Sequence, residues 1–408
     1  MNFRSAMERV EFRIFEEEIA HDEIVRFISE RKLERTPAIL NVEGRRVATN
    51  FLATRELLCR YLNICVDELA RFLAGLNAPG RIEVVKAEYG ELNSLRDLPV
   101  PKYFEGDAGR YITAGIVVTG NGNDYSSYNA SFHRMLVLDE RRMAARLVPP
   151  RHTYLRWKEA VERGEDLEIA ISIAPHPLFM FAAATRVGEG MEYGYAASLM
   201  GELAVTDVDG IMVPDSEVVI RGRITGEMVD EGPFIDITGT YDRVRKAPVV
   251  EVDAIYAKDD FHFYSITPAG YEHQVLMGVP YEPEIFRAVS RVCRVRNVVL
   301  TAGGRHYLHA VVQIEKVTDG DGKNAILAAF SAHPSLKHVV VVDDDIDIYS
   351  MEDVEYAIAT RFQADRDLVV ITNVRGSSLD PSARDNITAK MGIDATAKGD
   401  GEKYRRIY

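Results

Sequence analysis

The sequence predicts a multidomain α+β protein with an N-terminal α/β unit over residues 1–105, a central β-rich domain over 106–293 and a C-terminal α/β domain over 294–408. Two observations lead to this prediction. At 408 residues the chain is too long for one ordinary core and long enough for two or three domains. The spacing of apolar residues also changes twice along the chain, which indicates two boundaries.

The N-terminal part mixes helical and strand periodicity. Residues 11–34 have apolar residues at helical spacing, with acidic residues early and basic residues late, which suits a helix dipole. Residues 36–44 are predicted as a strand that ends at a glycine turn, residues 53–78 as helix and residues 81–89 as a second strand. The Leu-Pro-Val-Pro run at 98–101 then marks a plausible boundary.

The central part consists of short β-like runs separated by turn residues, a pattern typical of a barrel or a sandwich. The runs are YITAGIVVTG, SFHRMLVLD, EIAISIA, SEVVIRGRIT, FIDITGTYD, APVVEVDAIYA and FHFYSIT. The segment Ile169 to Thr185 is read as a buried strand followed by a helix start. In the C-terminal part, four apolar strands alternate with two helical segments, which predicts a buried parallel sheet followed by a loop-rich tail over residues 376–399.

Composition excludes some classes of function. A formal net charge of −14 argues against a nucleic-acid partner, which usually needs a basic face. The most apolar run is too short to span a bilayer, and the N-terminus has no apolar signal core, so we expect no membrane association. Three cysteines without zinc-like spacing are expected to be buried free thiols, which suits the cytoplasm.

A dispersed set of polar residues interrupts the apolar runs of the central part. Its members are Asn129, Arg134, Arg151, His152, Glu192, Glu231 and Asp236. Charged groups are rarely buried unless they are paired or bound to metal. If the segments converge, they form a metal ligand set, an anion-binding arginine and a carboxylate pair. Taken singly, each residue also has a structural explanation, such as an arginine paired at a barrel rim, a loop histidine or an acid beside a turn.

Two segments set conditions on that convergence. Asn129 and Arg134 are five residues apart, so in one continuous strand they would face opposite sides, and both can serve one site only if the segment turns. Glu231 and Asp236 flank a Gly-Pro turn. One such carboxylate can pair with an arginine and stay charged while the other carries a proton, which gives an acid/base pair.

The densest cluster of acidic residues follows the apolar strand at residues 338–342, in the C-terminal part of the chain. Asp343, Asp344, Asp345 and Asp347 could hold a divalent metal, as in a metal phosphohydrolase, because hard cations prefer carboxylate oxygens. No histidine accompanies them. The alternative is a strand end whose acids cap the next helix.

In their order and spacing, these segments resemble the UbiD-type decarboxylase family, whose members use prenylated FMN. LPVPKYFEGDAGRYITAGIVV resembles the entry into the family's cofactor domain, NASFHR its cofactor segment, GMEYGYAASLMGELAV its metal-glutamate helix and EGPFIDITGTY its catalytic region. HVVVVDDDIDIYSMEDVEYAIATR and AKMGIDAT resemble its C-terminal landmarks. The resemblance implies that the central domain is a flavin-binding split β-barrel.

The resemblance also implies a cofactor site. Asn129, His152 and Glu192 would hold a divalent metal, Mn²⁺ in this family, which together with K⁺ grips the cofactor phosphate. Lys390 is a weaker candidate for that phosphate. The residues that would line the flavin are Phe132, His133, Arg134, Arg146, Leu147, Val148, Arg151 and His152.

For catalysis, the resemblance implies that Arg134 pairs with Glu231 and orients the substrate carboxylate. Asp236 would donate the proton after carbon dioxide leaves, with the cofactor as electron sink. The chain departs from the family at two positions. Asp236 is one methylene shorter than the glutamate of some relatives, and Arg221 stands where the family often has an acid, which puts the local charge balance in question.

The implied function is a carboxy-lyase acting on an α,β-unsaturated acid. The short chain and compact N-terminus resemble the archaeal branch of the family, which implies conversion of trans-anhydromevalonate 5-phosphate to isopentenyl phosphate in isoprenoid biosynthesis. An aromatic acid such as a 4-hydroxybenzoate derivative is the alternative substrate, and a non-catalytic flavin-binding protein is the alternative from another class. A flavin prenyltransferase that supplies the cofactor and a homo-oligomer, dimer or hexamer, are the expected partners.

Overall fold

The computed structural model describes residues 1–399, 401–404 and 406–407, which form two compact units. The first unit comprises Met1–Asn63 and Asn77–His273, and the second comprises Ile64–Leu76 and the chain from Gln274 onward. The division into three parts at residues 105 and 293 stays a prediction. Among the described residues, no helix combines the length and the apolar character that a membrane crossing requires.

A nine-stranded sheet forms the core of the first unit and confirms the β-rich central part. Its strand order is β6-β9-β10-β17-β14-β11-β7-β8, and β5 pairs with β17. The strands are β5 (Gly90–Leu92), β6 (Tyr111–Ile112), β7 (Ile116–Thr119), β8 (Asn129–Phe132), β9 (Met135–Val137), β10 (Arg142–Ala145), β11 (Leu167–Ile173), β14 (Val218–Glu231) and β17 (Arg245–Ala257).

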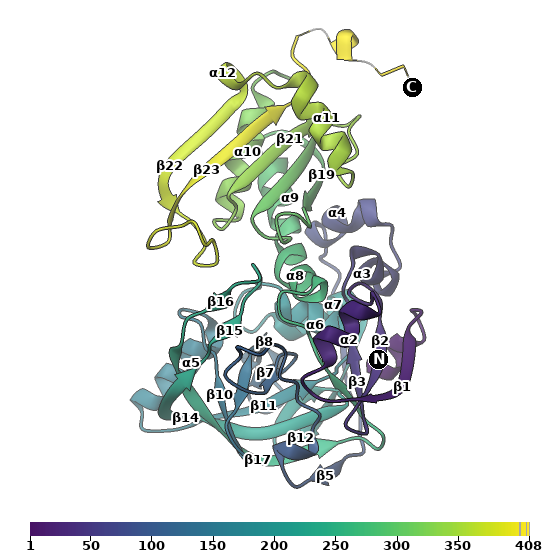
Figure 1. Ribbon diagram of the computed structural model, residues 1–408, viewed down its shortest axis with the longest axis vertical. Helices are drawn as coiled ribbons and strands as arrows, with labels where there is room; N and C mark the ends of the chain where they lie inside the picture. Colours follow the sequence, from purple (N-terminus) through teal and green to yellow (C-terminus); the bar gives the residue numbers. More distant parts are fainter. Residues whose placement is uncertain (400, 405, 408) are drawn as a thin grey trace. The chain divides into compact units, whose positions relative to one another are not determined.

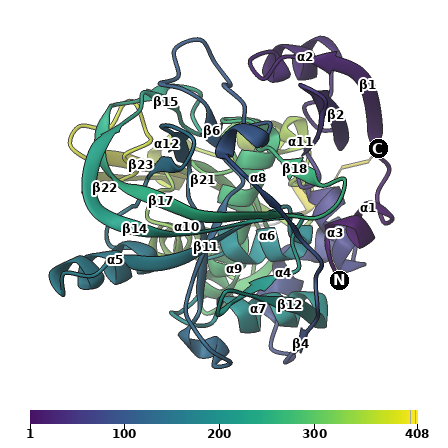
Figure 2. The ribbon, with the colours of Figure 1, turned by 90° about the horizontal axis from the view of Figure 1, so that it is seen from below.

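The sheet curls into a half-barrel because its two edges are joined by a very short link. β8 forms one edge and β9 lies next to the other, yet only His133 and Arg134 separate them in the chain. The Cα atoms that flank a two-residue link are at most roughly 10 Å apart, so the edges must approach each other. The long strands β14 and β17 bend to allow this (Figure 2).

A second sheet of the first unit has the order β1-β2-β3-β18, formed by β1 (Arg13–Ile19), β2 (Ala38–Val42), β3 (Arg45–Thr49) and β18 (His262–Tyr264). The helix predicted over residues 11–34 is therefore wrong in its first half, and only α2 (Ile24–Glu30) is helical. β1 pairs in parallel with β2, and this tertiary pairing outweighs the helical preference of its three consecutive glutamates.

The predicted helix over residues 53–78 is broken into α3 (Arg55–Leu62) and α4 (Leu69–Ala74). α3 ends at Asn63, which adopts the left-handed conformation with φ of 56°. α3 belongs to the first unit and α4 to the second.

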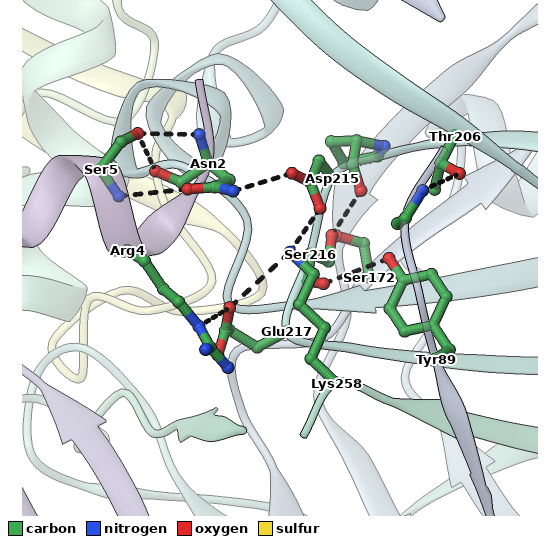
Figure 3. Close-up of polar contacts among 12 residues, drawn as sticks. Asn2, Arg4, Ser5, Tyr89, Ser172, Thr206, Asp215, Ser216, Glu217 and Lys258 are labelled. Carbon is green, nitrogen blue, oxygen red and sulfur yellow. Dashed lines mark hydrogen bonds and ion pairs between the residues drawn. The ribbon is translucent and has the colours of Figure 1, made fainter. Parts of the chain in front are cut away.

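The short helix α1 (Phe3–Met7) is held to the segment that leads into β14 by ion pairs and hydrogen bonds (Figure 3). Arg4 donates from Nε and Nη2 to both carboxylate oxygens of Glu217 at 3.0–3.1 Å, and the Glu217 side chain is fully buried. Asn2 donates to Asp215 at 2.9 Å, and Asp215 also pairs with Lys258. Figure 3 shows these side chains converging from distant parts of the chain.

Three helices and two small sheets complete the first unit. α5 (His152–Glu162) and α7 (Glu192–Met200) carry predicted site residues at their first positions, and α6 (Pro177–Ala184) follows β11 as predicted. One small sheet has the order β13-β12-β4, from β4 (Arg81–Val84), β12 (Glu202–Val208) and β13 (Ile211–Pro214). β15 (Phe234–Ile235) and β16 (Tyr241–Asp242) form a hairpin after β14.

The second unit is a five-stranded sheet with helices on both faces (Figure 1). Its order is β19-β20-β21-β23-β22, formed by β19 (Arg294–Leu300), β20 (His309–Glu315), β21 (His338–Asp343), β22 (Leu368–Arg375) and β23 (Ile387–Ala395). α9 (Glu282–Ser290) and α10 (Asp321–Ala332) cover one face, and α11 (Met351–Arg361) covers the other. α8 (Tyr271–Gly278) precedes α9, and α12 (Ala364–Asp367) precedes β22.

Two sequence predictions need correction in this unit. The sheet is parallel only across β20, β21 and β23, because both outer pairs are antiparallel. The predicted loop-rich tail contains β23, which lies between β21 and β22. Its polar residues Lys390 and Asp394 are buried at 5% and 0% exposure, so the polar sequence concealed an interior strand.

Candidate active site

Arg134 lies in the two-residue link between β8 and β9, where the two edges of the half-barrel meet. We call this junction the seam. β8 ends at Phe132 and β9 begins at Met135, so the segment turns and meets the condition for Asn129 and Arg134 to serve one site. The guanidinium packs 5.0 Å from the centre of the Phe234 ring. The sheet closure thus presents one arginine at the junction of its two edges.

Glu231, the last residue of β14, pairs with Arg134 in a two-point contact. Arg134 donates from Nε to Oε1 and from Nη2 to Oε2, both at 2.9 Å. The Glu231 side chain is fully buried and that of Arg134 is 14% exposed. Burial alone would lower the pKa of Arg134, but the hydrogen bonds and charge of Glu231 outweigh burial and raise it. The guanidinium of Arg134 therefore stays charged.

Asp242 extends this pair to a second arginine. Its Oδ2 accepts from Arg134 Nη2 at 3.4 Å and from Arg245 Nε at 3.1 Å, and its Oδ1 accepts from Arg245 Nη2 at 2.7 Å. Burial would raise the pKa of Asp242, but Arg245 and Arg134 hold it below its usual range. One carboxylate thus bridges two guanidinium groups.

Asp236 follows β15 in a tight turn. Its Oδ1 accepts from the backbone N–H of Ile237 at 2.7 Å, and its own N–H donates to the Thr240 carbonyl at 3.0 Å. Its carboxylate is close enough to raise the pKa of both Arg134 and His273. Asp236 therefore belongs to the same electrostatic cluster as the Arg134–Glu231 pair.

His273 faces this cluster with a defined tautomer. Its Nδ1 accepts a hydrogen bond from the Ala269 N–H at 3.0 Å, so the ring proton of the neutral form lies on Nε2. Burial lowers the pKa of His273 below its usual range, opposed by Asp236 and assisted by Arg134.

The three predicted metal ligands lie on neighbouring elements. His152 Nδ1 lies 3.3 Å from Glu192 Oε1, and Asn129 Nδ2 donates to the hydroxyl of Thr153, next to His152, at 2.9 Å. Glu192 is buried and its Oε2 has no hydrogen-bond partner. Burial raises the pKa of Glu192.

This arrangement fits a divalent cation. A buried, unpartnered carboxylate oxygen is costly unless a cation or a donor meets it. In the part of the chain that the structure describes, no three His, Cys, Asp or Glu side chains cluster closely enough to hold a metal ion. A cation here would need a further ligand, and the predicted one is the amide oxygen of Asn129, beside one imidazole nitrogen and one carboxylate.

The residues predicted to line a flavin lie in the chain at the end of β8 and between β10 and α5. His133 is buried, its Nδ1 lies 2.9 Å from the Arg146 carbonyl, and burial lowers its pKa. Phe132 is half-buried at the end of β8, and Leu147 is buried just after β10. Val148 and Arg151 are exposed before α5.

The remaining predicted polar groups belong to the second unit. Lys390 belongs to the second unit, where its Nζ donates to the Pro334 carbonyl at 2.6 Å and burial lowers its pKa to about 8. In that unit Arg361 binds Asp343 at 2.7 Å and Asp345 at 2.6–2.8 Å. An arginine thus neutralises these two acids, which favours the structural explanation over a metal phosphohydrolase. Asp344 and Asp347 take no part in this ion pair.

Arg221, the other departure noted in the sequence, is balanced locally. It is buried within β14, donates to the Ile169 carbonyl and pairs with Glu168 at 3.2 Å. Its charge is thus compensated on the neighbouring strand β11.

Several cluster members were missed in the sequence, namely Asp242, Arg245, His273 and the buried Tyr111 beside Glu231. For Arg245 the useful signal is strand register, since it lies directly opposite Glu231 between β14 and β17. The pairing of these strands could not be read from spacing alone.

Comparison with known proteins places the whole chain in one group. A family model described as the 3-octaprenyl-4-hydroxybenzoate carboxy-lyase Rift-related domain matches residues 77–271, and the C-terminal domain model of the same family matches residues 274–395. A protein of Archaeoglobus fulgidus named anhydromevalonate phosphate decarboxylase is 57% identical over 413 residues, covering 100% of this chain and 96% of that protein.

Solved structures show the same fold. The UbiD-class enzyme HmfF from Pelotomaculum thermopropionicum in complex with FMN has a TM-score of 0.92 and 32% identity, covering 100% of this chain and 97% of that one. An evolved dimeric form of that enzyme in complex with prFMN has a TM-score of 0.86 and 30% identity, covering 100% of this chain and 99% of that one.

Proposed function

We propose, because this chain belongs to the UbiD family of carboxy-lyases, that it converts trans-anhydromevalonate 5-phosphate to isopentenyl phosphate with bound prenylated FMN. The named activity of the Archaeoglobus relative supports the substrate, and the prFMN of the HmfF form supports the cofactor. The observation that carries the reaction is the buried two-point Arg134–Glu231 pair with Asp236 beside it.

Arg134 orients the substrate carboxylate. Glu231 occupies its Nε and Nη2, and no described residue is bonded to Nη1, which leaves that N–H pair for an anion. Glu231 fixes the plane of the guanidinium, and Arg134 therefore holds the substrate carboxylate at one angle.

Asp236 supplies the proton. When the bond between the carboxylate and the neighbouring carbon breaks, carbon dioxide leaves and an electron pair remains on that carbon. Bound prenylated FMN supplies the sink for this pair. Asp236 then protonates the same carbon, and water restores the proton of Asp236. Glu231 is paired with Arg134 and orients its guanidinium, so the proton comes from Asp236 and not from Glu231.

Asn129, His152 and Glu192 hold the metal, which we assign as Mn²⁺ with K⁺ beside it, and the metal binds the cofactor phosphate. Lys390 is a further candidate for that phosphate. The flavin itself is lined by Phe132, His133, Arg134, Arg146, Leu147, Val148, Arg151 and His152. The unpartnered Glu192 oxygen supports the metal assignment.

The proposal includes partners and location. Prenylated FMN requires a flavin prenyltransferase to make it, and the protein is expected to act in the cytoplasm as a homo-oligomer, either a dimer or a hexamer. The evolved form of HmfF that is described as dimeric supports self-association.

Co-expression with a flavin prenyltransferase tests this proposal. The purified protein should contain prenylated FMN by absorbance and mass, and it should release carbon dioxide from trans-anhydromevalonate 5-phosphate faster than from 4-hydroxybenzoate. Faster turnover of the aromatic acid would establish the alternative substrate. Cofactor binding without turnover of any unsaturated or aromatic acid would favour the non-catalytic flavin-binding protein.

A further inference from the structure

Strand register brings four charged side chains together at the seam, namely Arg134, Arg146, Glu231 and Arg245. Arg245 lies directly opposite Glu231 between the antiparallel strands β14 and β17. Ala145 lies opposite Met135 between β9 and β10, and the N–H of Arg146 donates to the carbonyl of Arg134 at 3.0 Å. Arg134 and Arg146 are therefore cross-strand neighbours as well.

This placement brings three arginines close together among the acids of the cluster. Like charges opposite each other on neighbouring strands are destabilising. Glu231 neutralises Arg134 and Asp242 neutralises Arg245, but no carboxylate among the described residues pairs with Arg146. Burial lowers the pKa of Arg146, and the charges of Arg245 and Arg134 lower it further. Arg146 thus adds a cation with no carboxylate bonded to it, beside the pairs that Arg134 and Arg245 make.

Asp242 holds two of these arginines in a fixed relation. Its Oδ2 accepts from both Arg134 and Arg245, at 3.4 and 3.1 Å. Arg245 uses Nε and Nη2 for this contact, and its Nη1 is bonded to none of the residues that the structure describes. Arg134 and Arg245 thus each have an Nη1 group without a partner among the described residues. The side chains of Arg245 and Asp242 are only partly exposed.

We propose that Arg245 determines substrate specificity by binding a second anionic group of the substrate, a phosphate at the end of the chain remote from the carboxylate that Arg134 holds. This inference rests on the proposed function and gives a role to a cation that the decarboxylation steps do not use. The fork of a guanidinium suits phosphate oxygens, and Asp242 orients that fork.

The kinetics of the prenylated-FMN holoenzyme on two related acids distinguish this role from a structural one. The two acids are trans-anhydromevalonate 5-phosphate and its dephosphorylated form. Arg245→Gln should lower the preference for the phosphorylated acid, as the ratio of kcat/KM values, by roughly 10- to 100-fold, mainly through KM. Arg245→Lys should recover part of that preference because it restores the charge.

Lys246→Gln is the matched control, since it removes one positive charge from the next residue, which is exposed and pairs with Asp230. It should leave the preference as in the wild type. An equal loss of kcat/KM on both acids in Arg245→Gln, or an unchanged preference, would overturn the inference.

Failure of the proposed function gives a different result. If the wild-type holoenzyme releases carbon dioxide from neither acid, the proposed substrate is wrong. Binding of inorganic phosphate, measured by calorimetry, then decides the role of Arg245. Weaker binding to Arg245→Gln than to Lys246→Gln supports the anion site, and equal binding overturns it.

Discussion

At the scale of single residues, the Arg134–Glu231 pair combines full burial with two-point geometry. The Glu231 side chain is completely shielded from water, and both of its oxygens accept hydrogen bonds from Arg134. Removing one partner of a buried ion pair leaves an uncompensated charge and is strongly unfavourable. Glu231 and Arg134 are therefore held together, which fixes the guanidinium for the substrate.

Replacing Glu231 by glutamine should separate binding from turnover. Glu231→Gln should lower kcat by roughly 10²- to 10⁴-fold because Arg134 loses its orienting partner, while the flavin stays bound. Decarboxylation rate and flavin absorbance measure the two effects. Glu227→Gln, an exposed position on the same strand, is the control. Loss of flavin together with activity would contradict the assigned role.

At the scale of secondary structure elements, two helix starts converge on the predicted metal site. His152 is the first residue of α5 and Glu192 is the first residue of α7. Free N–H groups and the positive end of the dipole make helix starts favourable for phosphate. The unpartnered oxygen of Glu192 is free to bind a cation. The proposed metal and the cofactor phosphate would satisfy both groups.

Glu192→Ala should therefore lose metal and cofactor together. We expect metal content, measured by inductively coupled plasma mass spectrometry, and flavin absorbance both to fall at least about tenfold, since metal-site substitutions typically cost 10- to 100-fold in affinity. Glu189→Ala is the control, because Glu189 is 58% exposed and pairs with Arg156 at the surface. Flavin content equal to that of the wild type would refute the ligand assignment.

At the scale of the whole molecule, each unit buries its own core, and the first unit is also fastened by long-range charge pairs. Arg4 and Glu217 are 213 residues apart in sequence, and His262 and Lys258 reach the same carboxylate. Burial would raise the pKa of Glu217, but hydrogen bonds from His262 and Arg4 and the charges of Arg4 and Lys258 lower it to about 2.

This network should make stability depend on pH in the acid range. Because the pKa of Glu217 is lower in the folded chain than the unfolded value of about 4.3, its contribution is complete above that value and is lost as the pH falls toward 2. Glu217→Gln should lower the free energy of unfolding by about 3 kcal/mol at pH 7 and by less near pH 3. Chemical denaturation at both pH values measures this, with Glu227→Gln as control, and a loss that is independent of pH would contradict it.

Much of the fold could be predicted because many elements follow local apolar patterns. The short runs of the central part formed strands, and the segment after Ile169 formed β11 and α6. The wrong predictions concern segments whose conformation is set by pairing with another strand. Residues 13–19 became a strand because β2 lies beside them, and β23 entered the sheet despite buried polar residues. Neither signal exists within the segment itself.

The sequence by itself determined the family, the order of the site segments and the types of residue that carry charge, because these depend on local composition and spacing. Only the tertiary structure decided which further charges join the Arg134–Glu231 pair that the resemblance implied. Arg134 and Glu231 are 97 residues apart, and Arg245 joins them through strand register. The curl of the sheet brings its two edges together at Arg134, and that closure depends on pairings across the whole first unit that no single segment specifies.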